Sequence, residues 1–294
     1  MLPIGATSLD WASVDVAVPR PSLRLPGISM AGFRQQAPVP TDIAMVAHPS
    51  VTLLLDLSED DGLVHDGPGW HGSGSVVVGL LPGELRTGGR VGECLQIRLE
   101  PAVAAAMLGV STELSGTVVE LEDVWGRDAG RAEDRLRSAG SWDERFTIAV
   151  DLLHRRPGSR PPVDPEIAHS WRRTLTSQGR VRVDGLAHEV GWSRKRLSAR
   201  FRSQLGITPK RAARLVRFDH AAHLLAAGHP VAGVAAESGY VDQSHLHREV
   251  KAFAGLTPAA VAVAPWLAID DVAWPATTRP GGRGSAHGGP PERP

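Results

Sequence analysis

The apolar positions of the first 100 residues fall in short runs that turn-forming residues interrupt. Two of these runs are aliphatic and partly β-branched, VTLLLDL at 51–57 and SVVVGLL at 75–81, with Gly, Pro or Asp nearby. A third run, CLQIRL at 94–99, alternates apolar and polar residues, as a strand with one buried face does. We therefore expect strands and turns from residue 1 to about residue 100.

After this region the spacing of apolar residues becomes helical. Pro101 suits the first turn of a helix that Gly109 ends, and 122–139 is a charged amphipathic segment that predicts a second helix. Ser141 and Glu144 have the spacing of a capping box, and apolar residues follow at helical intervals. The order predicts a β-rich amino-terminal domain with a helical extension, residues 1–156.

Proline and glycine mark the ends of the domains. The segment 157–162 (PGSRPP) cannot continue a helix, so we expect a linker there. Residues 275–294 are rich in Gly and Pro and poor in large apolar side chains, so we expect a disordered tail. Between these segments lies a second domain of residues 163–265.

An internal repeat dominates this second domain. LAHEVG at 186–191 matches VAAESG at 234–239 with an offset of 48 residues, and GITP at 206–209 matches GLTP at 255–258 with an offset of 49. One extra residue therefore lies in the turn of the second copy. In each copy we expect a short helix ended by a glycine, a tight turn, and a second helix that begins after a Ser or Asp cap.

The second helix of each copy carries two apolar residues four positions apart, Leu197 with Phe201 and Leu246 with Val250. A small alanine on the first helix lets the two helices cross closely. This pattern is a helix-turn-helix unit, and two units in register are a much more specific signal than one. A plain helical bundle is the alternative interpretation.

Charge divides the chain in a way that its net charge of +0 conceals. Residues 1–150 hold 11 Lys+Arg against 20 Asp+Glu, whereas residues 178–262 hold 13 against 6. This contrast points to a polyanionic partner for the basic domain. Within it, residues 178–220 hold 11 of the basic residues, so we expect the first unit to supply most of the attraction to phosphates.

The sequence also predicts a compartment. It shows neither a basic segment followed by an apolar one at its start nor an apolar run of about 20 residues, so we expect a cytoplasmic protein with no signal peptide and no membrane partner. Cys94 is the single cysteine, which excludes an internal disulfide and a zinc site of paired cysteines.

Residues 179–258 resemble the DNA-binding domain of the AraC/XylS regulators. The resemblance rests on the stretches LA, GWS, LGITPK, RF, SGY and DQSHL, which lie in that order between 186 and 246, and on GLTP at 255–258. It implies seven helices, with two helix-turn-helix units joined by a long helix at about 209–227. The chain departs from the family pattern at Leu246 and Val250, where aromatic residues are usual.

The resemblance further implies a partly β, cupin-like sensor domain in front of the all-α DNA-binding domain. The fold class is then α+β, with two domains, and the function is sequence-specific binding of double-stranded DNA by a bacterial transcription regulator that is not an enzyme. A small-molecule effector, RNA polymerase and a second copy of the chain are the further partners that the sequence leaves open.

The stripes opposite the buried apolar pairs are the expected DNA contacts. They are Arg194, Lys195, Ser198 and Arg202 in the first unit and Gln243, Ser244, His247 and Arg248 in the second. Recognition helices read bases mainly with their amino-terminal residues, and Gln, Arg and Lys can make paired contacts with base edges. A solvated basic face is the alternative for the first stripe, while the less charged second stripe favours polar readout of bases.

The amino-terminal domain offers few candidates. Trp70 and His71, in a glycine-rich segment, are candidates for a ligand pocket, with a surface turn as the alternative. His48, His65 and His71 lack the close spacing of metal ligands, so we expect no metal and no cofactor.

Two other classes of protein stay open. A DNA-binding repair or alkyl-transfer enzyme would use Cys94 as its acceptor, although a cysteine beside a strand is more often a buried small residue. The sequence contains no nucleophile motif, phosphate loop or metal constellation to support such an enzyme. A protein whose helices bind only other proteins would not need the positive charge of the first unit.

Overall fold

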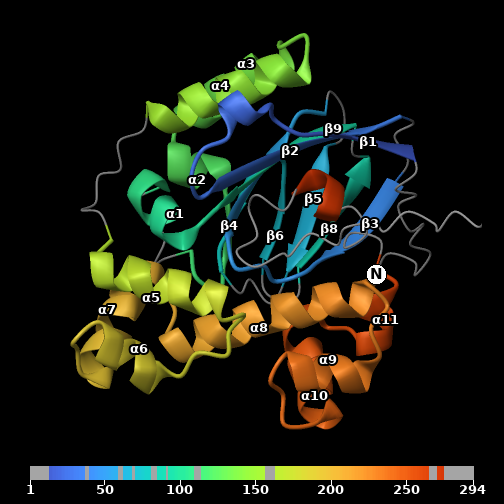
Figure 1. Ribbon diagram of the computed structural model, residues 1–294. Coiled ribbons are helices and arrows are strands. Elements are labelled where there is room, and N and C mark those ends of the chain that lie inside the picture. Colours follow the sequence, from blue (N-terminus) through green and yellow to red (C-terminus); the bar gives the residue numbers. More distant parts are fainter. Residues whose placement is uncertain are drawn as a thin grey trace, which may run out of the picture.

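The computed structural model describes residues 13–36, 40–58, 62–67, 70–80, 85–90, 92–108, 114–155, 163–264 and 270–274. A β-rich domain with its helices lies above an all-helical domain in Figure 1. The expected linker 157–162, the expected tail 275–294 and Gly109 lie outside the described residues. No described helix is long and apolar enough to cross a membrane.

In the described part of the chain, ten strands form two antiparallel sheets. The strands are β1 Val14–Ala17, β2 Ile28–Gln35, β3 Pro40–Met45, β4 Val51–Asp56, β5 Leu63–Gly67, β6 Trp70–Ser73, β7 Val76–Val78, β8 Leu85–Arg90, β9 Glu93–Leu99 and β10 Val118–Glu120. The larger sheet has the order β1-β2-β9-β4-β7-β10, and the smaller sheet has the order β3-β8-β5-β6. The β-rich region expected from the sequence is confirmed.

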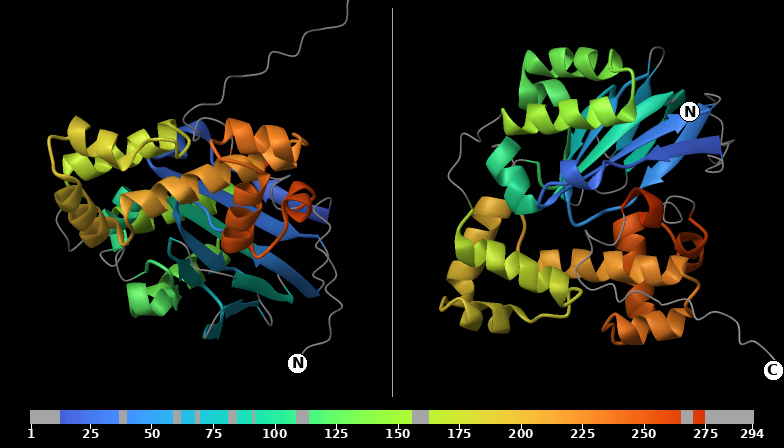
Figure 2. Two further views of the ribbon diagram at one scale, coloured as in Figure 1. Left: turned by 90° about the horizontal axis from the view of Figure 1, so that it is seen from below. Right: turned by 45° about the horizontal axis from the view of Figure 1, so that its top comes forward.

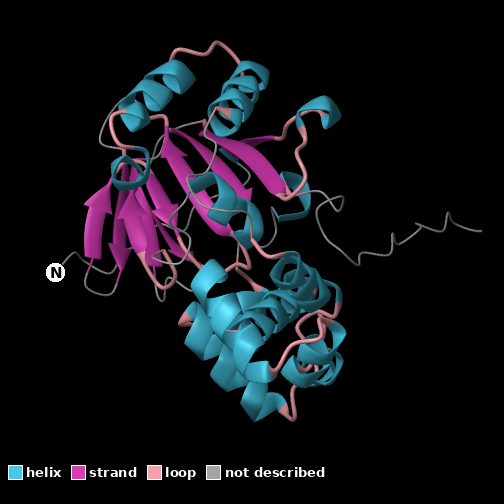
Figure 3. Cartoon of the chain, turned by 90° about the vertical axis from the view of Figure 1, so that its left-hand side faces the viewer, coloured by secondary structure: helices cyan, strands magenta, loops and turns pink. Residues whose placement is uncertain are grey.

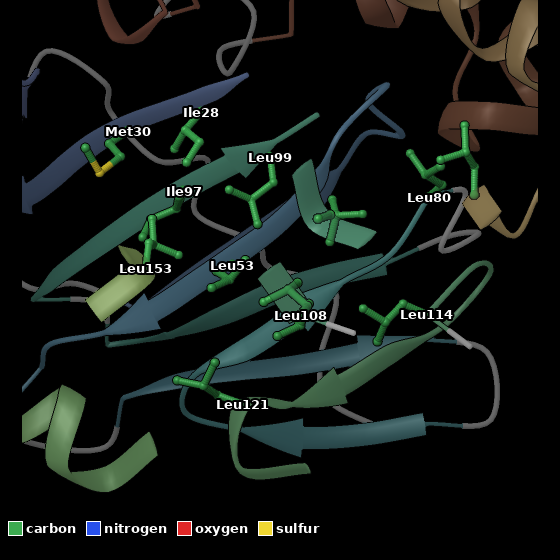
Figure 4. Close-up of a cluster of buried hydrophobic side chains, with 14 of the residues drawn as sticks. Ile28, Met30, Leu53, Leu80, Ile97, Leu99, Leu108, Leu114, Leu121 and Leu153 are labelled. Atoms are coloured by element: carbon green, nitrogen blue, oxygen red, sulfur yellow. The ribbon is translucent and has the colours of Figure 1, made fainter. Parts of the chain in front are cut away.

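The larger sheet is covered on both faces, which explains its continuous apolar runs. Every residue of β4 is buried. Leu53 and Leu55 belong to the cluster that the helices cover (Figure 4), whereas Leu54 and Cys94 face the smaller sheet and pack with its residue Leu63. The alternation that strands ordinarily show is absent from β4 because neither of its faces meets water.

Four helices and one 3-10 turn accompany these sheets. They are η2 Pro21–Leu23, α1 Pro101–Leu108, α2 Leu121–Trp125, α3 Asp128–Arg137 and α4 Trp142–His154. The single helix expected over 122–139 is wrong, because Gly126 takes φ 56° and the chain bends there between α2 and α3. The cap of α4 is confirmed: Ser141 Oγ accepts from the Glu144 N–H at 3.3 Å, and Glu144 Oε2 accepts from the Gly140 N–H at 2.9 Å.

The second domain is a bundle of seven helices within 163–264, as the family resemblance implies. They are α5 Pro165–Thr176, α6 Val183–Glu189, α7 Arg194–Leu205, α8 Pro209–Ala226, α9 Val231–Glu237, α10 Gln243–Ala254 and α11 Pro258–Ala262. The long helix α8 joins the two units and crosses beneath the β-rich domain (Figures 1 and 2). Both α5 and α11 pack against α8, so each unit has three helices of its own around a shared one.

The two domains touch along the upper side of the helical bundle (Figure 3). Helix α1 packs against α7, and His48 Nε2 lies 3.6 Å from Asp219 Oδ1 on α8. One apolar cluster runs from Ile28 in the sheet to Leu215 in α8 without interruption. The amino-terminal domain therefore contacts both the first unit and the helix that joins the units.

A short carboxy-terminal helix, α13 Asp270–Ala273, returns to the first domain and packs on β1 and β2. The side chain of Trp274, which is 5% exposed, packs with Ala31 and lies under the guanidinium of Arg98, 4.0 Å from the ring centre. No local pattern in the sequence predicts this contact, because its two sides lie more than 170 residues apart.

Replacing Trp274 with Ala should destabilise the fold, because it removes a buried ring from the outer strands. We expect a loss of about 3–5 kcal/mol in the free energy of unfolding, measured by denaturant titration of the full chain. Val272, in the same short helix but 59% exposed, gives the matched control: Val272→Ala should stay within about 0.5 kcal/mol of wild type. Equal effects of the two substitutions would contradict the docking of Trp274.

Candidate nucleic-acid interface

The first helix-turn-helix unit is held by a glycine turn and a serine cap. Gly191 takes φ 66°, which glycine adopts without strain, and the next N–H, of Trp192, donates to the carbonyl of Ala187 at 2.9 Å. Ser193 Oγ then accepts from the Arg196 N–H at 3.2 Å and begins α7. Leu197 and Phe201 are fully buried, so the face of α7 is set as the sequence predicts.

The second unit repeats these contacts. Gly239 takes φ 73°, and the Tyr240 N–H donates to the Ala235 carbonyl at 2.8 Å. Asp242 Oδ1 accepts from the His245 N–H at 2.7 Å and begins α10, in which the apolar pair is again fully buried. The helices that follow the two recognition helices, α8 and α11, also start alike, each with a threonine cap and a proline. The repeat in the sequence is therefore a repeat of three-dimensional structure.

The predicted contact stripes lie on the surface. In α7, Arg194, Lys195 and Arg202 are exposed and Ser198 is half-buried; in α10, Gln243, Ser244, His247 and Arg248 are exposed. The described residues of the amino-terminal domain leave both stripes open to solvent. Arg194 Nη1 lies 3.1 Å from Asp184 Oδ1, an exposed pair that costs little to break, so this guanidinium is available to a phosphate.

Arg194, Lys195 and Ser198 of the first stripe and Arg248 of the second line one hollow of about 1370 Å³, together with residues of α6, α8, α10 and the segments before α6, α8 and α10. The other predicted contact residues, Arg202, Gln243, Ser244 and His247, are not part of the lining of this hollow. Its lining holds eight Arg and Lys against three Asp and Glu. Besides Arg194, Lys195 and Arg248, these basic residues are Arg180, Arg182, Lys210, Arg214 and Arg217. These last five residues were not predicted from the sequence, although the helical spacing of Lys210, Arg214 and Arg217 is a signal that identifies three of them.

A buried carboxylate ties the second recognition helix to α8. Glu249, on α10 and 3% exposed, accepts from Arg214 Nε at 2.5 Å, and Arg217 Nη2 lies 3.4 Å from its other oxygen. The Arg217 guanidinium also lies 4.9 Å from the centre of the Tyr240 ring. These contacts join α8, the turn and α10, so they fix the angle at which α10 faces the hollow.

The three candidate histidines of the first domain do not cluster, and each contacts its own neighbours. His65 is fully buried, its two ring nitrogens 3.0 Å from Thr87 Oγ1 and 2.9 Å from the Gly74 carbonyl, and burial lowers its pKa. His48 contacts Ser50 and Asp219, and His71 is exposed beside Asp66. Within the described ranges, no group of three or more His, Cys, Asp or Glu could hold a metal ion.

The structure separates the two candidates for a ligand pocket. Trp70 packs against the cluster between the two sheets, with its ring centre 6.2 Å from that of His65. His71, the next residue of β6, is exposed, because successive residues of a strand face opposite sides. The pair does not converge on one site.

Cys94 lies between the two sheets and is buried. Burial, with Asp56 and Glu93 nearby, raises its pKa to about 12. Because the thiolate is the nucleophile, this environment disfavours an alkyl-transfer or redox role.

Glu249→Gln should weaken the hold of α8 on α10, because the amide cannot pair with two guanidinium groups. We expect a loss of about 1.5–3 kcal/mol in stability, measured by thermal or denaturant unfolding. Glu189, paired with Arg173 on an exposed surface, gives the control: Glu189→Gln should cost less than about 1 kcal/mol. A larger loss for the exposed pair would contradict the role given to Glu249.

The Cys94 thiol should resist modification in the folded chain. With its pKa more than three units above that of an exposed thiol, its thiolate fraction at pH 8 is about 1000-fold lower. An aromatic disulfide reagent should therefore release one equivalent of chromophore only after unfolding in guanidinium chloride. Complete reaction of the folded protein within minutes at pH 8 would contradict this burial.

Comparison with known proteins agrees with the geometry of the carboxy-terminal domain. Residues 186–262 match the family model of a helix-turn-helix domain. No curated protein sequence matches the chain. Similar solved structures include ToxT from Vibrio cholerae, 10% identical, covering 80% of this chain and 98% of that chain with a TM-score of 0.46.

They also include the carboxy-terminal domain of AraT, a response regulator from Geobacillus stearothermophilus, which is 22% identical. This match covers 34% of this chain and 85% of that chain, with a TM-score of 0.32. At these scores the likeness gives no information on ligands or contact residues. The family match does identify the domain. With its two capped helix-turn-helix units in tandem, the segment 186–262 is a helix-turn-helix domain, as the matching family model describes it.

Proposed function

We propose that this chain regulates transcription by placing α7 and α10 in successive major grooves on one side of a DNA duplex. The observation that carries the proposal is the hollow between the units, which Arg194, Lys195 and Ser198 of α7 and Arg248 of α10 line, and whose lining holds eight Arg and Lys against three Asp and Glu. A duplex laid across it would bring phosphates to the basic residues of α8 and base edges to both recognition helices. Chromosomal DNA as the partner places the protein in the cytoplasm.

The two units differ in charge, and this supports a division of labour. Arg194, Lys195 and Arg202 give the stripe of α7 three cations, so we assign it most of the attraction to phosphates. The stripe of α10 begins with Gln243 and Ser244, which are uncharged and suited to hydrogen bonds with base edges. His247 and Arg248 extend that stripe along the exposed face.

The amino-terminal domain is the proposed regulatory part. It contacts the recognition helix α7 through α1 and the joining helix α8 through His48, so a shift of this domain would act on α7 directly and on α10 through α8. An apolar hollow of about 440 Å³ lies where the domains meet, lined by residues of the segment before β2, α1 and α5, Val103, Met107 and Val163 among them. A small apolar molecule in it would touch both domains, and its volume is that of ordinary ligand pockets. The resemblance of the carboxy-terminal domain to the AraC/XylS regulators is the ground for proposing RNA polymerase as a partner and a homodimer as the assembly.

Measurements of DNA binding across a salt series test the proposed function and the proposed division of labour between α7 and α10. Arg194→Ala with Lys195→Ala should weaken binding to specific and nonspecific duplexes alike and flatten the salt dependence by about one unit for each phosphate that is no longer neutralised. Gln243→Ala should leave nonspecific binding nearly intact and cost about 1–3 kcal/mol on the preferred duplex. The measurement is the Kd of the full chain for a selected duplex and for a scrambled one.

Asp242→Ala is the control for folding, since loss of this cap should destabilise α10 by about 1 kcal/mol and weaken both kinds of binding together. If Gln243→Ala weakens specific and nonspecific binding equally while the free energy of unfolding is unchanged, the proposed division of labour is wrong. If the wild-type chain selects no duplex from a random pool at low salt, the proposed function itself fails.

A further inference from the structure

The two helix-turn-helix units differ by one inserted residue, and the structure identifies it as Val241. Trp192 and Tyr240 are equivalent, because each donates its N–H to the alanine carbonyl five residues before it. Ser193 and Asp242 are equivalent, because each caps the recognition helix that follows. The first unit goes directly from Trp192 to its cap, whereas the second places Val241 in between.

The inserted side chain takes no part in the packing of its own unit. Val241 is 87% exposed, although Tyr240 before it is 5% exposed and Asp242 after it is fixed by its hydrogen bond to His245. Since the first unit makes the same turn without such a residue, Val241 is not needed to form the turn. A single exposed apolar side chain is ordinary on a protein surface, so what Val241 can do depends on where it lies.

Its position is at the DNA-facing end of the second recognition helix. Val241 lines the hollow between the units together with the cap Asp242, with His245 and Arg248 of α10 and with Lys195 of α7. It directly precedes the amino-terminal turn of α10, and this turn is the part of a recognition helix that meets base edges.

Valine has no hydrogen-bond donor or acceptor in its side chain, which limits what it can read. In the major groove the apolar feature that distinguishes one base from the others is the C5-methyl group of thymine. Resting on the proposed binding of α10 in a major groove, we propose that Val241 is a specificity-determining residue that packs its methyl groups against a thymine methyl at one position of the preferred site.

The test removes the valine methyl groups and the thymine methyl group, first separately and then together. A preferred duplex is selected from a random pool with the full wild-type chain, and each thymine in it is then replaced, one at a time, by deoxyuridine, which lacks only the methyl group. At one position we expect the Kd of wild type to rise about fourfold, the factor that corresponds to one buried methyl group. Val241→Ala should bind the unmodified duplex with a similar loss and should be insensitive to deoxyuridine at that position alone.

Val263→Ala is the matched control, because Val263 is also a highly exposed valine of this domain, at 79%, but lies beyond the second unit. It should bind every duplex as wild type does. Thermal unfolding of Val241→Ala should be unchanged, since the side chain is exposed.

The outcomes are distinct. Sensitivity to one thymine methyl that Val241→Ala abolishes supports the proposal. If wild type selects a duplex but no deoxyuridine effect depends on Val241, the assignment is overturned while DNA binding stands. If wild type selects no duplex, the proposed function fails and this inference fails with it.

Discussion

The arrangement of the DNA-binding domain depends on one continuous helix that contributes to two separate apolar cores. Ala212 and Leu215, in the first half of α8, pack into the cluster that contains α7, whereas Phe218 and Leu225, in the second half, pack into the cluster that contains α10. A helix of 18 residues is about 27 Å long. Because both units are held on the same rod, their separation and their relative rotation are set together.

This constraint explains what the ion pair between Arg214 of α8 and the buried Glu249 of α10 contributes. Packing of Leu246 and Val250 alone leaves α10 free to rotate slightly about its own axis, since apolar contacts have little directionality. The hydrogen bond from Arg214 to Glu249 is directional and joins α8 to α10. Helix α8 fixes the distance between the two units, and the ion pair fixes the rotation of α10 about its own axis. Together they give the domain one defined face toward a duplex.

Local features of this protein could be predicted from its sequence, and long-range ones could not. The caps at Ser193 and Asp242 and the buried pairs of the recognition helices depend on residues within a few positions of each other, and the structure confirms them. The break at Gly126 was missed because a charged amphipathic spacing continues through it. The hollow between the units, the contact of α1 with α7 and the docking of Trp274 all join distant segments, so no local pattern announces them.

The return of the chain to its first domain limits how that domain and the DNA-binding domain can move apart. Seven residues separate Arg155 from Val163 on the way in, and five separate Ala264 from Asp270 on the way out. A fully extended chain covers about 29 Å with the first connection and about 22 Å with the second. While Trp274 stays in its place, the helical bundle is therefore tethered to the first domain at both of its ends. It can rotate or shift relative to that domain only as far as the two short connections allow.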